Sequence, residues 1–158
     1  MKKILSISIF MFFILNTYSQ EDYVKLPYAK SNSPTIIIEK DIIANESTIE
    51  VSKALITGMS VMKLKPNRKE HKFFNLSEGG IVFVTLKETP AFKTQAELNE
   101  FFGIHKDNQV YLNGYLIEDK DYKIATNSIV EVELIKPDSR NKLEGKTINI
   151  WVTKKSNI

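Results

Sequence analysis

Short runs of β-branched and aromatic residues alternate with polar loops along most of this chain. In the first half, apolar residues gather in Thr35–Glu39, Met59–Pro66 and Ile81–Leu86. β-branched residues favour strands, and Ile81–Leu86 is largely apolar on both faces, as in the centre of a sheet. We therefore expect three strands here, the last of them central.

The second half has a hairpin signal in Gln109–Ile117, where Asn113 and Gly114 stand between apolar residues. Both residue types tolerate the positive φ angles of a two-residue type I′ turn, so this segment predicts a tight hairpin. Two later strands are predicted with one apolar face each: Ser128–Pro137 through Val130, Val132 and Leu134, and Thr147–Lys155 through Ile148, Ile150 and Val152.

One helix is predicted near 94–103. Thr94 and Glu97 have the spacing of a capping box, and Gly103 is placed to end the helix. A helix this short needs tertiary packing, so we expect its apolar face to lie on a sheet. That face is expected to consist of Leu98, Phe101 and Phe102.

A second short helix is expected at Thr48–Thr57. Ser47 and Glu50 also have capping-box spacing, and Gly58 is placed as a C-cap, although several β-branched residues in the segment oppose a helix. Taken together, the elements predict an α+β fold with small mixed β-sheets and one or two short helices.

The N-terminus has the pattern of a secretory signal peptide. Lys2 and Lys3 precede the uncharged, largely apolar run Ile4–Leu15, and Thr17 and Ser19 fit a small-residue cleavage site before Gln20. The run is shorter than the roughly 20 residues of a spanning helix, which disfavours the alternative of a membrane anchor. We expect signal peptide 1–19, a flexible polar leader 20–33 and a periplasmic or secreted protein with no transmembrane segment after cleavage.

Removal of the signal changes the charge balance. The whole chain has 22 basic and 19 acidic residues, so loss of Lys2 and Lys3 leaves a net charge of +1. Neither nucleic acid nor an anionic membrane is expected as a partner. A basic cluster is interpreted as a solvated loop: Lys63, Lys65, Arg68, Lys69 and Lys72. The chain has no cysteine, so it has no disulfide to stabilise it.

The two halves share an order of motifs. Each has a strand, a strand ending in a hydrophobic residue followed by Lys-Pro, a polar loop with Glu-Gly, and a strand ending in Lys. Leu64 precedes Ile135 by 71 residues in this comparison, and Glu78-Gly79 precedes Glu144-Gly145 by 66. The pattern predicts an internal repeat of 34–88 and 89–158, against the alternative of chance similarity between β-rich segments.

The second half resembles the plug domain of TonB-dependent outer-membrane receptors. The resemblance lies in Val110–Gly114 with its Asn-Gly, in Ile129–Lys136 and in Ile148–Lys155 after Gly145, and the first half is similar but weaker. The usual Tyr-Gly of the loop and a TonB-binding box before Thr35 are missing, and the residues up to Ile158 do not include the long barrel that comes after the plug in those receptors. The resemblance implies two plug-like units in a Gram-negative envelope and does not imply transport.

The sequence contains no recognisable catalytic or metal-binding pattern. His71 and His105 belong to no ligand cluster, and the sequence has no nucleophile elbow, phosphate loop or complete calcium loop around Asp119 and Asp121. Glu118 stands beside these two carboxylates at a predicted turn, where solvation is expected. We therefore expect no enzyme, no cofactor and no metal site.

Binding is the remaining expectation, and the aromatic residues of the second half are its candidates. We predict a contact surface around Tyr111, Asn113, Tyr115 and Trp151, together with an exposed strand edge. The expected function is a non-enzymatic envelope interaction module with a protein partner, for example a TonB-type outer-membrane receptor. The alternatives are a small glycan- or peptide-binding protein that uses the same aromatics, or burial of these side chains in the fold.

Overall fold

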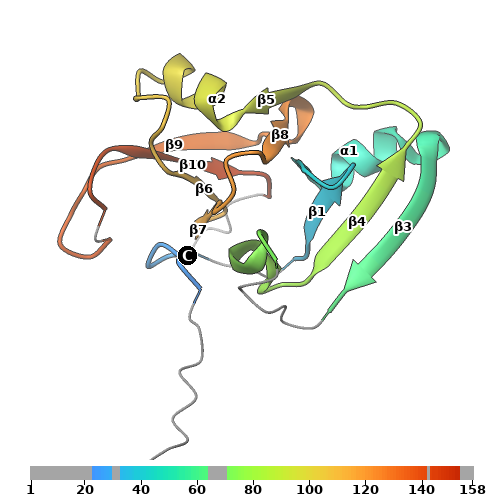
Figure 1. Cartoon of the computed structure of the whole chain (residues 1–158), viewed down its shortest axis with the longest axis horizontal. Helices are drawn as coiled ribbons and strands as arrows, with labels where there is room; N and C mark the ends of the chain where they lie inside the picture. The colour runs from blue at the N-terminus through green and yellow to red at the C-terminus, as the bar shows by residue number, and fades with distance from the viewer. Residues whose placement is uncertain (1–22, 30–32, 64–70, 142, 154–158) are drawn as a thin grey trace, which may run out of the picture.

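The computed structural model describes residues 23–29, 33–63, 71–141 and 143–153. The expected signal peptide and three of the five residues of the basic cluster, Lys65, Arg68 and Lys69, lie outside these ranges. The described chain has an α+β fold of two mixed sheets and two short α-helices, as the sequence predicts (Figure 1). None of its helices combines the length and apolar character needed to cross a membrane.

The first sheet has six strands in the order β3-β4-β1-β2-β8-β5. In this sheet β1 is antiparallel to β2 and parallel to β4, and β3 is antiparallel to β4. The strands are β1 (Thr35–Ile38), β2 (Ile42–Ala44), β3 (Ile56–Met62), β4 (Ile81–Leu86), β5 (Phe92–Thr94) and β8 (Lys123–Ala125). The bounds of β4 are those predicted, and the predicted first strand extends one residue beyond β1.

The second sheet has four strands in the order β7-β6-β10-β9. Here β6 is antiparallel to β7 and parallel to β10, and β9 is antiparallel to β10. The strands are β6 (Val110–Leu112), β7 (Tyr115–Leu116), β9 (Glu131–Ile135) and β10 (Thr147–Trp151). The predicted hairpin is therefore present, with Asn113 and Gly114 as its turn.

Four strands of each sheet share one arrangement. In chain order, the set β1, β2, β3, β4 and the set β6, β7, β9, β10 have the same neighbours and the same directions. The registers of the parallel pairs correspond as well, since Ile36 lies opposite Val82 as Val110 lies opposite Ile148. The hairpins differ by one residue, because Asp41 is an extra residue between β1 and β2. Met62 pairs with the first residue of β4 as Ile135 pairs with the first residue of β10, so Met62 and Ile135 are equivalent. The sequence comparison aligns Leu64 with Ile135, and its hydrophobic-Lys-Pro match is therefore displaced by two residues.

Helix α1 (Glu46–Val51) begins earlier than predicted. Its N-cap is Asn45, whose side chain accepts a hydrogen bond from Thr48 N at 3.0 Å, and not Ser47. The 3-10 helix η2 (Lys53–Leu55) follows, and Ile56 already begins β3. Gly58 is therefore part of a strand and does not cap a helix, in agreement with the β-branched residues that opposed the longer helix.

Helix α2 (Gln95–Phe101) has the predicted capping box of Thr94 and Glu97, but a different buried face. Gln95, Leu98 and Asn99 are buried, whereas Phe101 is 81% exposed. Phe102, the third residue of the predicted face, is 39% exposed. The two buried amides bond to loop carbonyls, Gln95 to Asp119 and Tyr122 and Asn99 to Lys106 and Asn108. Hydrogen bonding to these loops thus sets the orientation of α2.

The main core lies between the two sheets. It contains Ile37 and Ile81 from the first sheet and Val110, Leu112 and Ile148 from the second. A second cluster covers the opposite face of the first sheet, against Ile49 of α1. Inserted strands β5 and β8 belong to the second half of the chain but extend the first sheet, so the two halves interlock.

Candidate functional site

The four predicted contact residues lie around one end of the second sheet, on different sides of it. Tyr115 faces the core between the sheets, whereas Tyr111 faces outward in a separate cluster with Leu26 and Ile135. Tyr111, Tyr115 and Trp151 are only 4%, 5% and 5% exposed. The structure therefore places these aromatics inside the fold, which is the burial alternative weighed in the sequence, and they form no exposed aromatic patch.

The outer face of the second sheet is covered by the N-terminal strap, residues Tyr23–Ala29. Lys25 forms an antiparallel bridge with Tyr115. Leu26 N donates to Gly114 O at 2.7 Å, and Leu116 N donates to Val24 O at 3.0 Å. The strap thus adds an edge to β7, and in Figure 1 it runs beside that strand in blue. The sequence predicts a flexible leader at 20–33, but residues 23–29 within it are packed against the second sheet.

Side chains of the strap cover the outer face of the second sheet, where Tyr111 and Trp151 lie. Leu26 is 2% exposed beside Tyr111, and the ring of Tyr28 stacks on Trp151 with the ring centroids 6.4 Å apart. Trp151 Nε1 donates to Glu133 Oε2 at 3.1 Å, which satisfies the indole in this covered position. The sequence contained a weak signal for the strap, because Val24, Leu26 and Tyr28 alternate with Lys25 and Pro27.

An ionic contact holds the other face of the strap. Lys25 Nζ lies 2.9 Å from Glu78 Oε1 and 5.4 Å from the centre of the Tyr115 ring. The Tyr115 hydroxyl donates to Glu78 Oε2. Burial, followed by this hydrogen bond, raises the pKa of Tyr115 above its ordinary range, so the hydroxyl stays protonated as a donor at neutral pH. Glu78 therefore connects the strap, β7 and the loop before β4.

The side chain of the turn residue Asn113 accepts hydrogen bonds from within the fold and does not face a partner. Its φ is 49°, and its Oδ1 accepts hydrogen bonds from Val152 N at 3.0 Å and Thr153 Oγ1 at 3.4 Å. Gly114 N in turn donates to Asn149 Oδ1 at 2.8 Å. Two asparagine side chains thus fasten the hairpin to β10, and Asn113 turns its acceptor inward. Sequence reasoning missed Asn149, since a buried asparagine within a strand gives no recognisable pattern.

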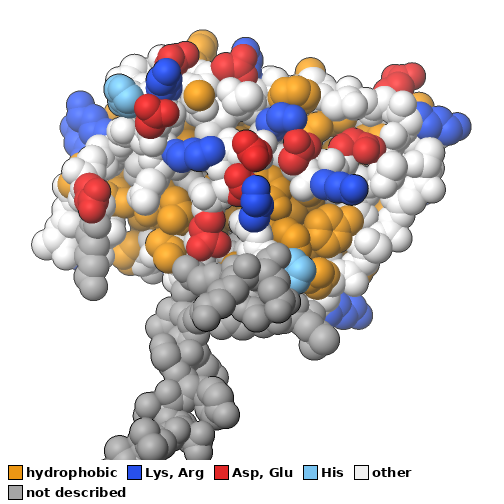
Figure 2. All heavy atoms as spheres, viewed as in Figure 1, with side chains coloured by type: hydrophobic (Ala, Val, Ile, Leu, Met, Phe, Trp, Pro, Cys, Tyr) orange, Lys and Arg blue, Asp and Glu red, His pale blue; other side chains and the backbone are white. Residues whose placement is uncertain are grey.

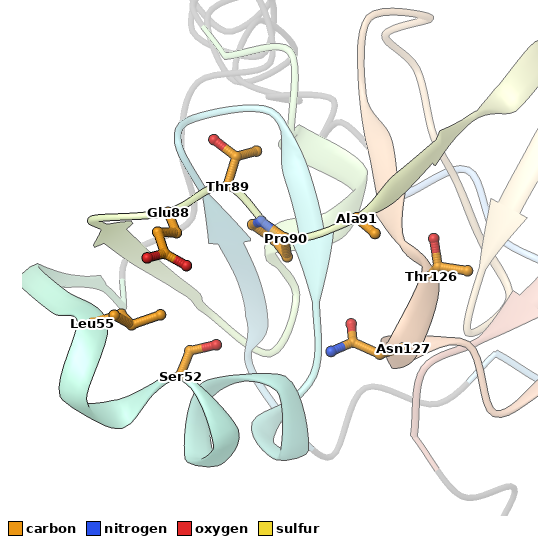
Figure 3. A pocket seen from close by; sticks show the side chains of 8 residues that line it. All are labelled: Ser52, Leu55, Glu88, Thr89, Pro90, Ala91, Thr126 and Asn127. Carbon is orange, nitrogen blue, oxygen red and sulfur yellow. The ribbon is translucent and has the colours of Figure 1, made fainter.

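A separate pocket lies where the two halves meet (Figure 3). It has a volume of about 460 Å³. Glu88 and Asn127 extend into it from opposite sides in Figure 3. Its lining comprises Ser52 and Leu55 beside α1, the β4–β5 connection from Glu88 to Ala91, and Thr126 and Asn127 of the 3-10 helix η4 (Thr126–Ser128). No sequence pattern pointed to this pocket, because its residues come from three distant segments.

The pocket lining limits the chemistry available there. It offers one carboxylate, one amide and three hydroxyls, with no histidine, lysine or second carboxylate. Such a set donates and accepts hydrogen bonds, as a polar ligand requires. Within the described ranges no group of three or more His, Asp or Glu residues is placed to hold a metal ion, and Asp119 instead lies 2.9 Å from Lys72 Nζ.

Charged residues are mixed in sign over the face shown in Figure 2, where Lys and Arg alternate with Asp and Glu around apolar side chains. The chain was also compared with known proteins. No family model, curated protein or solved structure matches it.

Proposed function

We propose that the protein is an exported, non-enzymatic interaction module of the bacterial envelope, built from two plug-like units. The exported character rests on the signal pattern of residues 1–19. The plug-like character rests on the resemblance of the second half to receptor plug domains. Its partner in this proposal is an envelope protein, with a TonB-type outer-membrane receptor as the first candidate.

An internal duplication is part of this proposal. Strand order and direction agree between the two sets of four strands, and so does the register of the parallel pairs β1–β4 and β6–β10. A side-chain contact agrees as well: Glu39 Oε1 accepts from Leu86 N at 2.8 Å, as Asn113 Oδ1 accepts from Val152 N at 3.0 Å. Chance similarity of β-rich sequences does not account easily for a shared hydrogen bond at the same turn position, and this supports descent of both units from one.

One observation carries the interaction role: the β7 edge and the face beside Tyr111 and Trp151 hold an extended segment from outside both units. The strap supplies main-chain hydrogen bonds to Gly114 and Leu116 and places Leu26 in an apolar site. This is the recognition mode of β-strand addition, in which the edge gives affinity and alternate side chains give specificity. We propose that a strand of the partner takes the place of the strap.

The test is site-specific photo-crosslinking in native envelopes. A crosslinker replaces Leu116 on the β7 edge, which stays in place when the strap leaves, and the strap is weakened by Leu26→Ser. The proposal expects an envelope protein to be captured more strongly by the Leu26→Ser chain, and a synthetic peptide of residues 20–29 to compete with it. The matched control carries the crosslinker at Val51, which is 85% exposed on α1. Equal capture at both positions, or none that the peptide reduces, would overturn the strand-addition role.

A second function, binding of a small glycan or peptide, is favoured only by the pocket at Glu88 and Asn127. Hydroxyl, amide and carboxylate groups in an open pocket suit a polyhydroxylated ligand. The aromatics predicted for that role are buried, so the pocket would have to act without them. A glycan array with the wild-type chain and Asn127→Ala separates the two functions, because only the pocket role predicts binding that this substitution removes.

A further inference from the structure

The edges of the two sheets differ in how they are protected. Among the described residues β7 is covered by the strap, β9 carries Glu131 and Glu133, and β5 carries Lys93. The seven residues of β3, Ile56–Met62, include no charged side chain, and β4 is the strand that pairs with them. Natural sheets block free edges with charges, Pro or a covering segment. The β3 edge lacks the first two and, within the described chain, the third. Its register shift lies between Ile56 and Gly58, before the stretch Met59–Met62.

Hydrogen bonding within the sheet fixes which backbone groups of β3 point outward. Thr35 N donates to Gly80 O and Glu39 N donates to Val84 O, so the even-numbered residues of β4 face β1. The odd-numbered residues of β4 then face β3, and pair there with Ser60 and Met62. Because peptide groups alternate along a strand, Met59 and Val61 direct their N–H and C=O groups to the open edge. Their side chains are each 56% exposed.

We propose that this edge pairs antiparallel with the β3 edge of a second copy of the chain. A two-fold axis through Ser60 places Met59 of each copy opposite Val61 of the other, on one face of a continuous sheet. Both residues have outward backbone groups, as a hydrogen-bonded pair requires. The pairing also sets an apolar side chain against an apolar side chain and brings no two like charges together. The proposal does not depend on the envelope partner proposed above.

The second sheet provides the reason for choosing β3 and a second copy. In β9, Val132 and Leu134 pair with β10 at the positions where Met59 and Val61 of β3 pair with β4. The free edges of β9 and β3 therefore direct corresponding backbone groups outward. The same self-pairing of β9 would centre on Glu133 and place two carboxylates directly opposite each other. Like charges in that position destabilise a strand pair. Ser60 takes the place of Glu133 in β3, and the charge pattern therefore admits self-pairing at β3 alone of these two equivalent edges.

Sedimentation velocity of the chain beginning at Gln20 tests the pairing. We expect a concentration-dependent dimer with a dissociation constant on the order of 100 µM, since one strand edge buries little area. Ser60→Glu recreates the β9 pattern and is expected to weaken the dimer at least about tenfold, or 1.4 kcal/mol. Ser60→Thr keeps an uncharged strand former and should retain the dimer. The matched control Leu134→Glu adds the same charge to the β9 edge and should leave the dimer unchanged.

Amide hydrogen exchange of the wild-type chain gives a second, mutation-free measurement. The amides of Met59 and Val61 are expected to exchange rapidly in dilute protein and slowly in concentrated protein. The proposal is overturned by a chain that stays monomeric up to about 1 mM. It is also overturned if Leu134→Glu weakens the dimer as much as Ser60→Glu, or if the two amides are protected at every concentration, which would mean that the chain covers its own edge.

Discussion

The β1–β2 turn and the β6–β7 turn have different sequences but similar backbone angles at their first two positions, although Ile38 pairs with Ile42 across three residues and Leu112 pairs with Tyr115 across two. Glu39 and Lys40 have φ angles of 50° and 78°, and Asn113 and Gly114 have 49° and 89°. Glu39 N donates to Val84 O as Asn113 N donates to Ile150 O, at 3.1 and 2.9 Å. Asn-Gly is therefore not required for this turn here. An acceptor side chain at the first position and the pairing with the adjacent strand specify it in both units.

The surroundings of the second turn position differ between the two units as well. An added Cβ at Gly114 would lie 2.6 Å from Ala29 of the strap, so the close approach of the strap requires glycine there. Lys40, at the corresponding position of the first unit, carries a long side chain at a similar φ. Glycine at position 114 thus avoids both the cost of a left-handed backbone and a clash with the strap, whereas Lys40 meets only the first of these.

The largest expected effect tests this difference. Gly114→Ala should destabilise the chain by roughly 3 kcal/mol or more, because a left-handed non-glycine residue costs about 1–2 kcal/mol and displacement of the strap exposes Leu26. Urea unfolding measures the loss, and Trp151 fluorescence reports the strap, since Trp151 is the one tryptophan of the chain.

Lys40→Ala is the matched variant, with the same residue introduced at the equivalent turn position. It should change stability by less than about 0.5 kcal/mol, because neither the φ requirement nor a close neighbour differs from the wild type. A loss from Lys40→Ala as large as that from Gly114→Ala would show that any substitution at this turn position destabilises the chain, and that contact with the strap is not the cause.

A medium effect is expected from the shared acceptor. Asn113→Ala should cost about 2 kcal/mol, because Val152 N loses its partner and alanine tolerates a positive φ less well than asparagine. Glu39→Ala should cost about 1 kcal/mol, since Leu86 N loses its partner but glutamate gave no φ advantage. Glu39→Asn keeps an acceptor and improves the turn, so it should not lower the midpoint of urea unfolding. A loss from Glu39→Asn as large as that from Glu39→Ala would contradict the equivalence of the two turns.

Sequence patterns predicted the local elements well where one signal dominated. The capping box of α2, the Asn-Gly hairpin and the apolar strand β4 each follow from a few neighbouring residues. The buried face of α2 did not follow, because Gln95 and Asn99 are buried to bond loops that come 7 to 27 residues later. The candidate site was predicted least well. Tyr111 and Trp151 were expected in contact with a partner, and whether they are reachable depends on the strap, which lies far from them in sequence.

The smallest expected effect concerns the pH at which the strap detaches in alkaline solution. Burial, with smaller contributions from Glu133 and Asp138, raises the pKa of Tyr28 to about 12 from an ordinary 10.0. A raised pKa means that the folded state holds this proton more tightly than the unfolded state, so the contribution to stability is complete below about pH 10 and is lost as the pH rises towards 12. Trp151 stacks on Tyr28, and its fluorescence should therefore shift in this interval as the strap detaches. Tyr28→Phe removes the titrating hydroxyl and should move the shift to higher pH.

Tyr122 also has a pKa of about 12 but lies in the core between the sheets, so Tyr122→Phe should leave the Trp151 shift in place. If both variants move the shift equally, the fluorescence reports unfolding of the whole chain, and the strap is not a separately detachable part of the second unit.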